Sequence, residues 1–148
     1  MIMLNIALIL LLTLNSCALY QDSDEPNIFY HFSDFETLEL GKTFSDMIIS
    51  NDQNAIYLSD YNNNALLKIC TLNSLVLEKH TIVGSHPIAL DISPNDSLIA
   101  IAHEGESSIL LLNSQDMTIY SSFSVTLMNM NDIAFINDTT LIISSKTD

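Results

Sequence analysis

The sequence predicts an all-β protein made of repeated four-stranded antiparallel sheets. Three observations support this prediction: a pattern that recurs every 43 residues from Leu40 onward, short apolar runs with a two-residue alternation, and clusters of turn-forming residues between the runs. After the apolar N-terminal stretch, no segment keeps the spacing of apolar residues that an amphipathic helix needs.

The repeat is visible without gaps. Leu40-Gly41 stands 43 positions before Val83-Gly84. Three sets of apolar residues follow the same spacing: Met47, Leu90 and Ile133; Ile49, Ile92 and Phe135; Ala55, Leu98 and Leu141. The first two sets lie two residues apart, which places each pair on one face of a strand. A fixed period of this size indicates a repeat architecture.

Between the apolar runs lie "SNDQN" (50–54), "SPNDS" (93–97) and "INDTT" (136–140), whose residues favour tight turns. They predict hairpins. The clearest repeat contains four expected strands: Ile88 to Ser93, Leu98 to Ala102, Ser108 to Leu112 and Thr118 to Val125. Four short strands in about 43 residues are the unit of a β-propeller blade, in which each sheet packs on its neighbours.

Residues 83–96, "VGSHPIALDISPND", resemble the V-G-x-x-P-x-x-x-x-x-S-P-D-G opening of Tyr-Val-Thr-Asn (YVTN) type propeller repeats. "IYLSD" (56–60) resembles their Tyr-Val-Thr-Asn strand, and "NALLKI" (64–69) the strand that follows. The likeness covers residues 40 to 145 and implies an exported, often surface-located bacterial protein. Asn95-Asp96 stands where that family prefers Asp-Gly, and His103 where it prefers Asn.

The expected organisation has three parts: a signal peptide (1–16), a lipidated tether (17–27) and a partial β-propeller (28–148). The propeller part divides into a half blade (28–40), a blade (44–83), a blade (87–126) and a second half blade (130–145). Gly41, Gly84 and Pro87 mark the crossings between blades, because glycine permits a positive φ and proline suits the first residue of a strand.

Two full blades and two half blades do not close a ring, since propellers close with about four to eight blades. A seven-bladed ring at this period would need about 300 residues. We therefore expect the sequence to be the N-terminal fragment of a longer protein. The alternative is a ring assembled from about three open copies.

An uncharged apolar run from Ile6 to Leu12 has the length of the h-region of a signal peptide. Directly after it, Leu14-Asn15-Ser16-Cys17 resembles the lipobox of bacterial lipoprotein precursors. This resemblance implies lipidation of Cys17 and an anchor in the bacterial outer membrane or at the cell surface. The alternative is ordinary cleavage after Ser16-Cys17-Ala18, which would give a secreted or periplasmic protein.

Four lysines, no arginine and 18 acidic residues give a net charge of −14. Such a charge disfavours a nucleic acid partner, because both surfaces repel each other. It indicates either solubility alone or attraction to cations or a basic partner. Cys70 is the one cysteine beyond Cys17, and its apolar neighbours favour a small buried side chain over a reactive thiol.

The residues that could carry chemistry do not form a recognised site. The histidines are His31, His80, His86 and His103, and they lack the spacing or cysteine partners of zinc motifs. Glu104 and Glu106 could hold a cation weakly in the turn "HEGE", but two carboxylates in a turn are usually solvated. Asp91 and Asp132 are expected near the channel of the ring, as structural polar groups or as ligand contacts.

We therefore expect no metal site, no cofactor and no catalytic residue among these residues. With three glycines and no G-x-S-x-G elbow, the sequence supports neither a phosphate loop nor a serine hydrolase. The function predicted is a non-catalytic envelope lipoprotein whose propeller binds a protein or a small ligand. The alternative is a fragment of a lactonase-like or quinoprotein-like propeller enzyme, with its catalytic residues in further blades.

Overall fold

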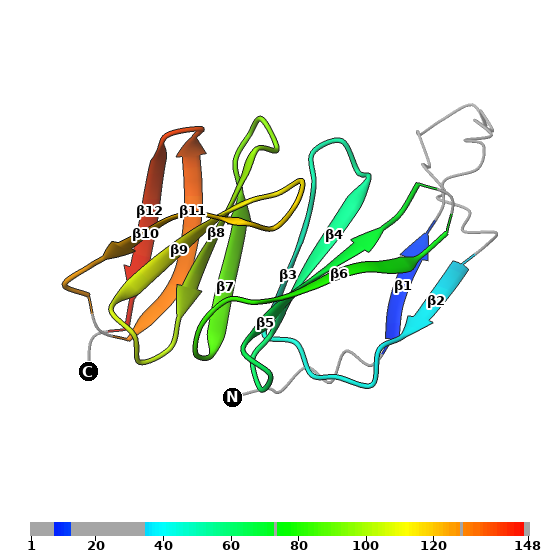
Figure 1. The fold of residues 1–148 in the computed structure, drawn as a ribbon, viewed down its shortest axis with the longest axis horizontal. Coiled ribbons are helices and arrows are strands. Elements are labelled where there is room, and N and C mark those ends of the chain that lie inside the picture. The colour runs from blue at the N-terminus through cyan, green and yellow to red at the C-terminus, as the bar shows by residue number, and fades with distance from the viewer. Residues whose placement is uncertain (1–7, 13–34, 73, 128, 147–148) are drawn as a thin grey trace, which may run out of the picture.

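Four antiparallel sheets follow one another in a row along the chain (Figure 1). The computed structural model describes residues 8–12, 35–72, 74–127 and 129–146. These residues form twelve strands and no helix, which confirms the all-β prediction. Accordingly, no described helix could span a lipid bilayer.

Two sheets are complete four-stranded meanders. The second blade contains β3 (Asp46–Ile49), β4 (Ala55–Asp60), β5 (Ala65–Cys70) and β6 (Val76–Ile82) in that spatial order. The third blade contains β7 (Pro87–Ile92), β8 (Leu98–His103), β9 (Ser108–Asn113) and β10 (Ile119–Ser124). The four strands expected from the clearest repeat agree with β7 to β10 to within two residues at each end.

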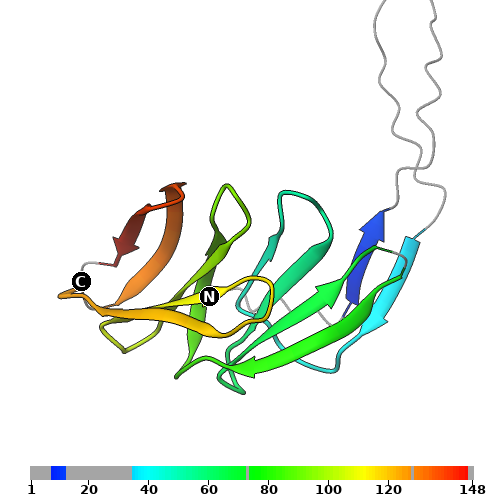
Figure 2. The same ribbon diagram turned by 45° about the horizontal axis from the view of Figure 1, so that its top comes forward.

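The other two sheets have two strands each, and they lie at opposite ends of the row (Figure 2). The first half blade pairs β1 (Leu8–Leu12) with β2 (Phe35–Glu39). The last half blade pairs β11 (Met130–Asn137) with β12 (Thr140–Ser145). From β3 onward, each strand after the first in a blade follows its neighbour through a short turn, so these blades are built from local hairpins.

The N-terminal predictions meet the structure only in part. Leu8–Leu12, expected within a signal peptide, are strand β1 against β2. The remaining residues of the signal peptide and the tether, including Cys17, lie outside the described residues. The same is true of 28–34, the first part of the half blade expected at 28–40. The signal peptide and the lipid anchor therefore stay predictions.

The core lies between the sheets. We call the side of a sheet that faces the following sheet its C-terminal face, and the other side its N-terminal face. Between the second and third blades, Tyr57 and Leu66 pack against Leu90 and Ile99 within one apolar cluster. A second cluster joins the third blade to Ile133 and its neighbours on the last half blade. A third lies on the N-terminal face of the second blade, where Leu38 of β2 contributes. This face-to-face burial is the main apolar stabilisation that the fold offers.

The turns between the first two strands of each complete blade use the same local chemistry. The hydroxyl oxygen of Ser50 accepts the N–H of Ala55 at 3.0 Å, and that of Ser93 accepts the N–H of Leu98 at 2.9 Å. Asp96 has a φ of 58°, which is the left-handed conformation. Aspartate tolerates this conformation better than most residues do.

The crossing into the third blade leaves room for glycine only. Gly84 has a φ of 118°, and a Cβ there would lie 2.9 Å from Nε2 of His103. The His103 ring is 2% exposed, and its Nε2 lies 3.0 Å from the carbonyl oxygen of Val83. Gly41, at the preceding crossing, also has a positive φ of 61°, and Pro87 begins β7.

The last hairpin is one residue tighter than the others. Ile92 lies opposite Ile99, whereas Phe135 lies opposite Leu141, because β11 and β12 pair with register shifts. Leu141 therefore corresponds in space to Ile99. The sequence match of Leu141 with Leu98 is wrong by one residue, since a one-residue change in a turn cannot be seen in an ungapped repeat.

Candidate binding groove between the second and third blades

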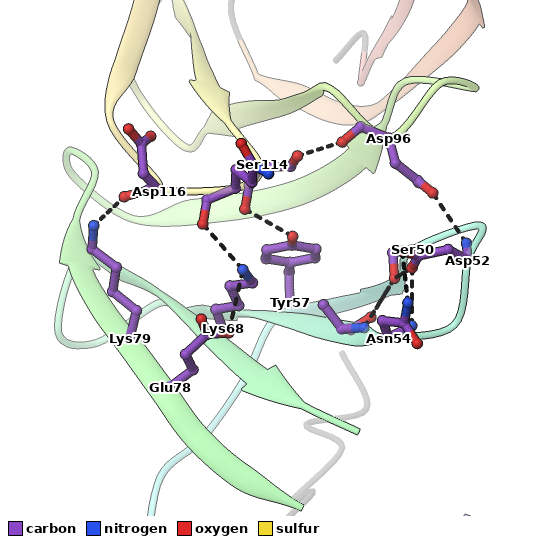
Figure 3. Close-up of polar contacts among 12 residues, drawn as sticks. Ser50, Asp52, Asn54, Tyr57, Lys68, Glu78, Lys79, Asp96, Ser114 and Asp116 are labelled. Atoms are coloured by element: carbon purple, nitrogen blue, oxygen red, sulfur yellow. Dashed lines mark hydrogen bonds and ion pairs between the residues drawn. The ribbon is translucent and has the colours of Figure 1, made fainter. Parts of the chain in front are cut away.

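A groove of about 780 Å³ lies where the second blade meets the turns of the third blade. Strands β4 and β5 form one side of it. The opposite side is formed by the β7–β8 turn, with Asp96, and by the β9–β10 turn, with Ser114 and Asp116 (Figure 3). Because the two sides come from different blades, the shape of the groove depends on how the blades pack.

Tyr57 of β4 connects the two sides. Its hydroxyl donates a hydrogen bond of 2.9 Å to the backbone carbonyl oxygen of Ser114 (Figure 3). The side chain is 3% exposed. Burial raises the pKa of Tyr57 to about 12. The Ser114 hydroxyl in turn donates to the carbonyl oxygen of Asp96, so the two turns of the third blade are also joined.

Two of the four lysines reach across from the second blade to the β9–β10 turn. Nζ of Lys68 donates to the carbonyl oxygen of Gln115 at 3.1 Å and lies 3.2 Å from the Glu78 carboxylate. Nζ of Lys79 donates to the carbonyl oxygen of Asp116. Both ammonium groups therefore hold backbone acceptors of the next blade, and Lys68 also pairs with a carboxylate.

Local donors favour the charged form of two carboxylates of the groove, Asp52 and Asp116. The hydroxyl of Ser50 and then the N–H of Asn54 lower the pKa of Asp52 below its ordinary value. The hydroxyl and N–H of Thr118 do the same for the pKa of Asp116. Asp96 accepts hydrogen bonds from the backbone N–H groups of the β3–β4 turn. The groove is therefore fixed in shape and rich in hydrogen-bond acceptors.

The thiol of Cys70 also lines the groove. It is half-buried and is not part of a disulfide, so it differs from the buried apolar side chain favoured by the sequence. No histidine is among the residues that line the groove. The thiol and the serines there consequently have no imidazole beside them to act as a general base.

Similar solved structures share this arrangement of sheets. The WD40 repeats of RRP9 match with a TM-score of 0.56 and 15% identity over 64% of this chain and 29% of that one. WD40 repeats form four-stranded propeller blades. The fold of this chain is that of a β-propeller.

Two further propeller-like matches have higher TM-scores. Hydrazine synthase of Kuenenia stuttgartiensis matches with a TM-score of 0.64 and 12% identity over 69% of this chain and 29% of that chain. Sqt1 of Saccharomyces cerevisiae matches with a TM-score of 0.64 and 14% identity over 76% of this chain and 34% of that chain. The chain thus spans about a third or less of these proteins. No protein-family model and no curated protein match the sequence.

The propeller fold places the predicted channel carboxylates on successive inner strands. Asp91 of β7 accepts the N–H of Phe135 on β11, and Asp46 of β3 accepts the N–H of Leu90 on β7 at 2.7 Å. Asp132 accepts the N–H of its own neighbour Ile133. Burial raises the pKa of Asp46, and the nearby charges of Asp132 and Asp91 act in the same direction. Two hydrogen bonds from backbone N–H groups oppose this shift but do not cancel it.

The histidines are not gathered into one site. His103 points into the fold, away from Glu104 and Glu106 of the same "HEGE" turn, both of which are exposed. The ring of His86 lies against that of Tyr61, with centroids 4.6 Å apart and ring planes tilted by 37°, and the Tyr61 hydroxyl donates to Glu104. His80 lies on the exposed outer strand β6, whereas His31 falls outside the described residues. Within the described part of the chain, no three acidic, histidine or cysteine side chains are placed to hold a metal ion.

Sequence reasoning missed Tyr57, Lys68, Lys79 and Asp46. The first three carry no motif, because their partners are backbone carbonyls 37 to 57 residues away. For Asp46 a signal existed. Asp46 and Asp132 lie two periods apart, and this repetition of an acidic residue beside an apolar strand position could have indicated a repeated contact.

We predict that Tyr57→Phe changes the pH dependence of stability. The folded state keeps the Tyr57 proton up to a pKa of about 12, whereas the unfolded state releases it near the ordinary value of 10.0. The free energy of unfolding therefore includes a contribution that is complete below pH 10 and is lost as the pH rises toward 12.

Tyr57→Phe removes this contribution and leaves the Ser114 carbonyl without its donor, which costs about 1 to 2 kcal/mol at neutral pH. Urea unfolding of both proteins between about pH 7 and about pH 11.5 measures the effect. We expect the difference in free energy of unfolding between the wild type and Tyr57→Phe to shrink as the pH rises above about 10. A difference that stays constant across this range would contradict the assignment.

Proposed function

We propose that the protein is a non-catalytic, lipid-anchored envelope protein of bacteria whose propeller blades bind a partner through the groove between the second and third blades. The observation that carries this proposal is the groove itself, about 780 Å³ in volume and lined by side chains already fixed by hydrogen bonds. A preorganised, concave surface of this kind suits binding, because little conformational entropy remains to be lost.

The charge of the groove favours a basic partner. Asp52, Asp96, Asp116 and Glu78 line it, and the chain as a whole carries a net charge of −14. Only two lysines reach these four carboxylates, so the groove keeps a net negative charge. We infer that the bound segment presents lysine or arginine side chains, since opposite charge speeds encounter and selects the partner.

The anchor rests on the sequence. The apolar run before Cys17, the lipobox resemblance and the likeness to YVTN-type repeats together support export and attachment by lipid to the outer membrane or cell surface. Cleavage before Cys17 would remove β1 from the mature protein. Strand β2 would keep its place on the second blade through Leu38, which packs against the cluster containing Leu58 and Leu67.

An enzymatic role as part of a lactonase-like or quinoprotein-like propeller is not favoured. Such chemistry needs acid, base or metal-binding groups that converge on one site. The groove contains carboxylates and a thiol without a histidine, and the inner-strand carboxylates Asp46 and Asp91 accept hydrogen bonds from backbone N–H groups of the next sheet.

We predict that the protein incorporates fatty acid through Cys17. Cells expressing the wild-type chain are grown with a radiolabelled fatty acid, and the protein is then immunoprecipitated. Cys17→Ala should abolish labelling and move the protein from the membrane fraction to the soluble fraction, because the acyl chains provide the anchor. Cys70→Ala is the matched control and should be labelled like the wild type. Equal labelling of Cys17→Ala and wild type would exclude the lipid anchor.

The binding proposal is tested by photo-crosslinking from the groove. A Cys17→Ala chain carries a thiol-linked photo-crosslinker on Cys70, and envelope extract is irradiated with it. We expect crosslinked peptides rich in lysine and arginine, identified by mass spectrometry. The control, Cys17→Ala/Cys70→Ser/Ser122→Cys, carries the same probe on the exposed outer strand β10. Capture of the same peptides from both positions, or of none from Cys70, would contradict binding in the groove.

A further inference from the structure

The groove between the second and third blades has an apolar end that its acidic residues do not account for. Leu72, in the β5–β6 turn, lines the groove and is 64% exposed. Cys70, the last residue of β5, lines it as well. Val76 begins β6 directly opposite Cys70 and is 52% exposed. We call Cys70, Leu72 and Val76 the apolar end of the groove.

The strand register places the apolar end on the face that looks toward the third blade. Cys70 lies opposite Ala55 of β4 on one side and Val76 of β6 on the other. Residues directly opposite each other in antiparallel strands share a face of the sheet. Ala55 belongs to the apolar cluster that joins the second blade to the third, so Cys70 and Val76 are also on the C-terminal face. Both sheets that bound the groove are complete four-stranded blades.

The repeat does not require apolar residues in the turn at this end. One period after Cys70 and Leu72 stand Asn113 and Gln115, which are polar. The β5–β6 and β9–β10 connections contain the same number of residues. Since a polar sequence forms the equivalent connection in the third blade, folding alone does not explain Cys70 and Leu72. Neighbouring exposed apolar side chains at a concave surface are typical of a contact with a partner.

A carboxylate lies beside the apolar end. The N–H of Thr71 donates to the carbonyl oxygen of Asn54 at 3.1 Å. This bond holds the β5–β6 turn, with Leu72, against the β3–β4 turn, where Asn54 and Asp52 lie (Figure 3). Asp52 is exposed and lines the groove. A bound segment therefore meets an apolar surface and an anionic surface next to each other.

We propose that the partner is a peptide segment in which a large aliphatic or aromatic side chain stands next to a lysine or arginine. The apolar side chain packs on Leu72 and Val76, and the basic side chain pairs with Asp52. This inference rests on the proposed function, in which the groove binds a basic segment. A purely basic segment would leave the apolar end in water, whereas a purely apolar one would cover Asp52 without a countercharge. The groove thus recognises the combination, since apolar burial adds affinity and charge adds selectivity.

Peptide selection tests the preference. A phage-displayed library of random peptides is selected on the full Cys17→Ala chain, which we call the parent chain. We expect the selected peptides to be enriched both in basic and in large apolar residues. On Leu72→Ser in the parent chain, the basic enrichment should persist and the apolar enrichment should be lost. Leu77→Ser is the matched control, because Leu77 is 43% exposed but lies opposite Ile69 of the N-terminal face, and its peptides should resemble those of the parent chain.

A double-mutant cycle then locates the apolar contact. The affinity of the most enriched peptide is measured by fluorescence polarisation, together with a version whose apolar residue is serine. Leu72→Ser and the peptide change should each weaken binding about fivefold, because a leucine at the edge of a groove contributes only part of its full burial. Both changes together should weaken binding little further. Val76→Ser repeats the cycle, and far-UV circular dichroism checks that each variant is folded.

A second cycle locates the charge contact. Asp52→Asn should weaken binding of the enriched peptide, because the basic side chain loses its partner. A version of the peptide with glutamine in place of that basic residue should bind the parent chain and Asp52→Asn equally. A peptide whose loss on Asp52→Asn is the same with and without its basic residue would contradict the assigned pairing.

The outcomes separate this inference from the proposed function. Basic peptides without apolar enrichment on the parent chain would overturn the inference and leave the basic partner in place. The same holds if Leu72→Ser and Leu77→Ser change the selected peptides equally, or if the losses are additive in the cycles at both Leu72 and Val76. If no basic peptides are selected on the parent chain, the groove proposal is wrong, and the inference is wrong with it.

Discussion

The carboxylate of one inner strand accepts a backbone N–H from the inner strand of the next sheet, and the rest of the structure depends on this contact. Asp46 and Leu90 are 44 residues apart, as are Asp91 and Phe135. An inner strand has a sheet neighbour on one side only, so its other edge presents N–H groups without strand partners. The carboxylates satisfy these groups and fix how far each sheet is shifted along the next. The apolar faces between the sheets supply the attraction but, being non-directional, do not set that position.

The groove depends on the same positioning of one sheet against the next. Its two sides belong to different blades, and the hydrogen bonds of Tyr57, Lys68 and Lys79 all cross from the second blade to the β9–β10 turn of the third. The Asp96 carboxylate adds a link from the β7–β8 turn to the β3–β4 turn. Polar side chains that would otherwise be free to bind a ligand are thereby used to hold neighbouring blades together. What remains for a partner is a rigid, acidic concavity rather than a flexible loop.

The strands could be predicted from the sequence because their causes are local. Leu90 and Ile92 alternate with more polar neighbours, and the "SPNDS" turn follows them. This local pattern predicts β7 and β8 nearly to the residue. The position of Gly84 at a crossing also follows from local sequence. The contact that makes this glycine necessary does not, since His103 is 19 residues further along the chain and approaches it only once β8 has packed.

The site could not be predicted for the same reason. Tyr57 and Ser114 are 57 residues apart, and a tyrosine in a strand gives no indication of which carbonyl its hydroxyl will reach. The tighter last hairpin was also hidden, because a deletion of one residue in a turn leaves the apolar alternation of both strands intact. Periodicity thus predicts which elements form, and the contacts between periods decide what the surface can bind.

Hydrogen exchange of two backbone amides, measured by NMR, tests the role of the inner-strand carboxylates most directly. In Asp46→Ala the Leu90 amide should exchange at least tenfold faster than in the wild type, because its acceptor is gone, while the Phe135 amide keeps its protection. In Asp91→Ala the Phe135 amide should exchange at least tenfold faster, while the Leu90 amide keeps its protection. If both amides keep wild-type protection in both variants, the carboxylates do not hold the sheets in place and the central claim is wrong.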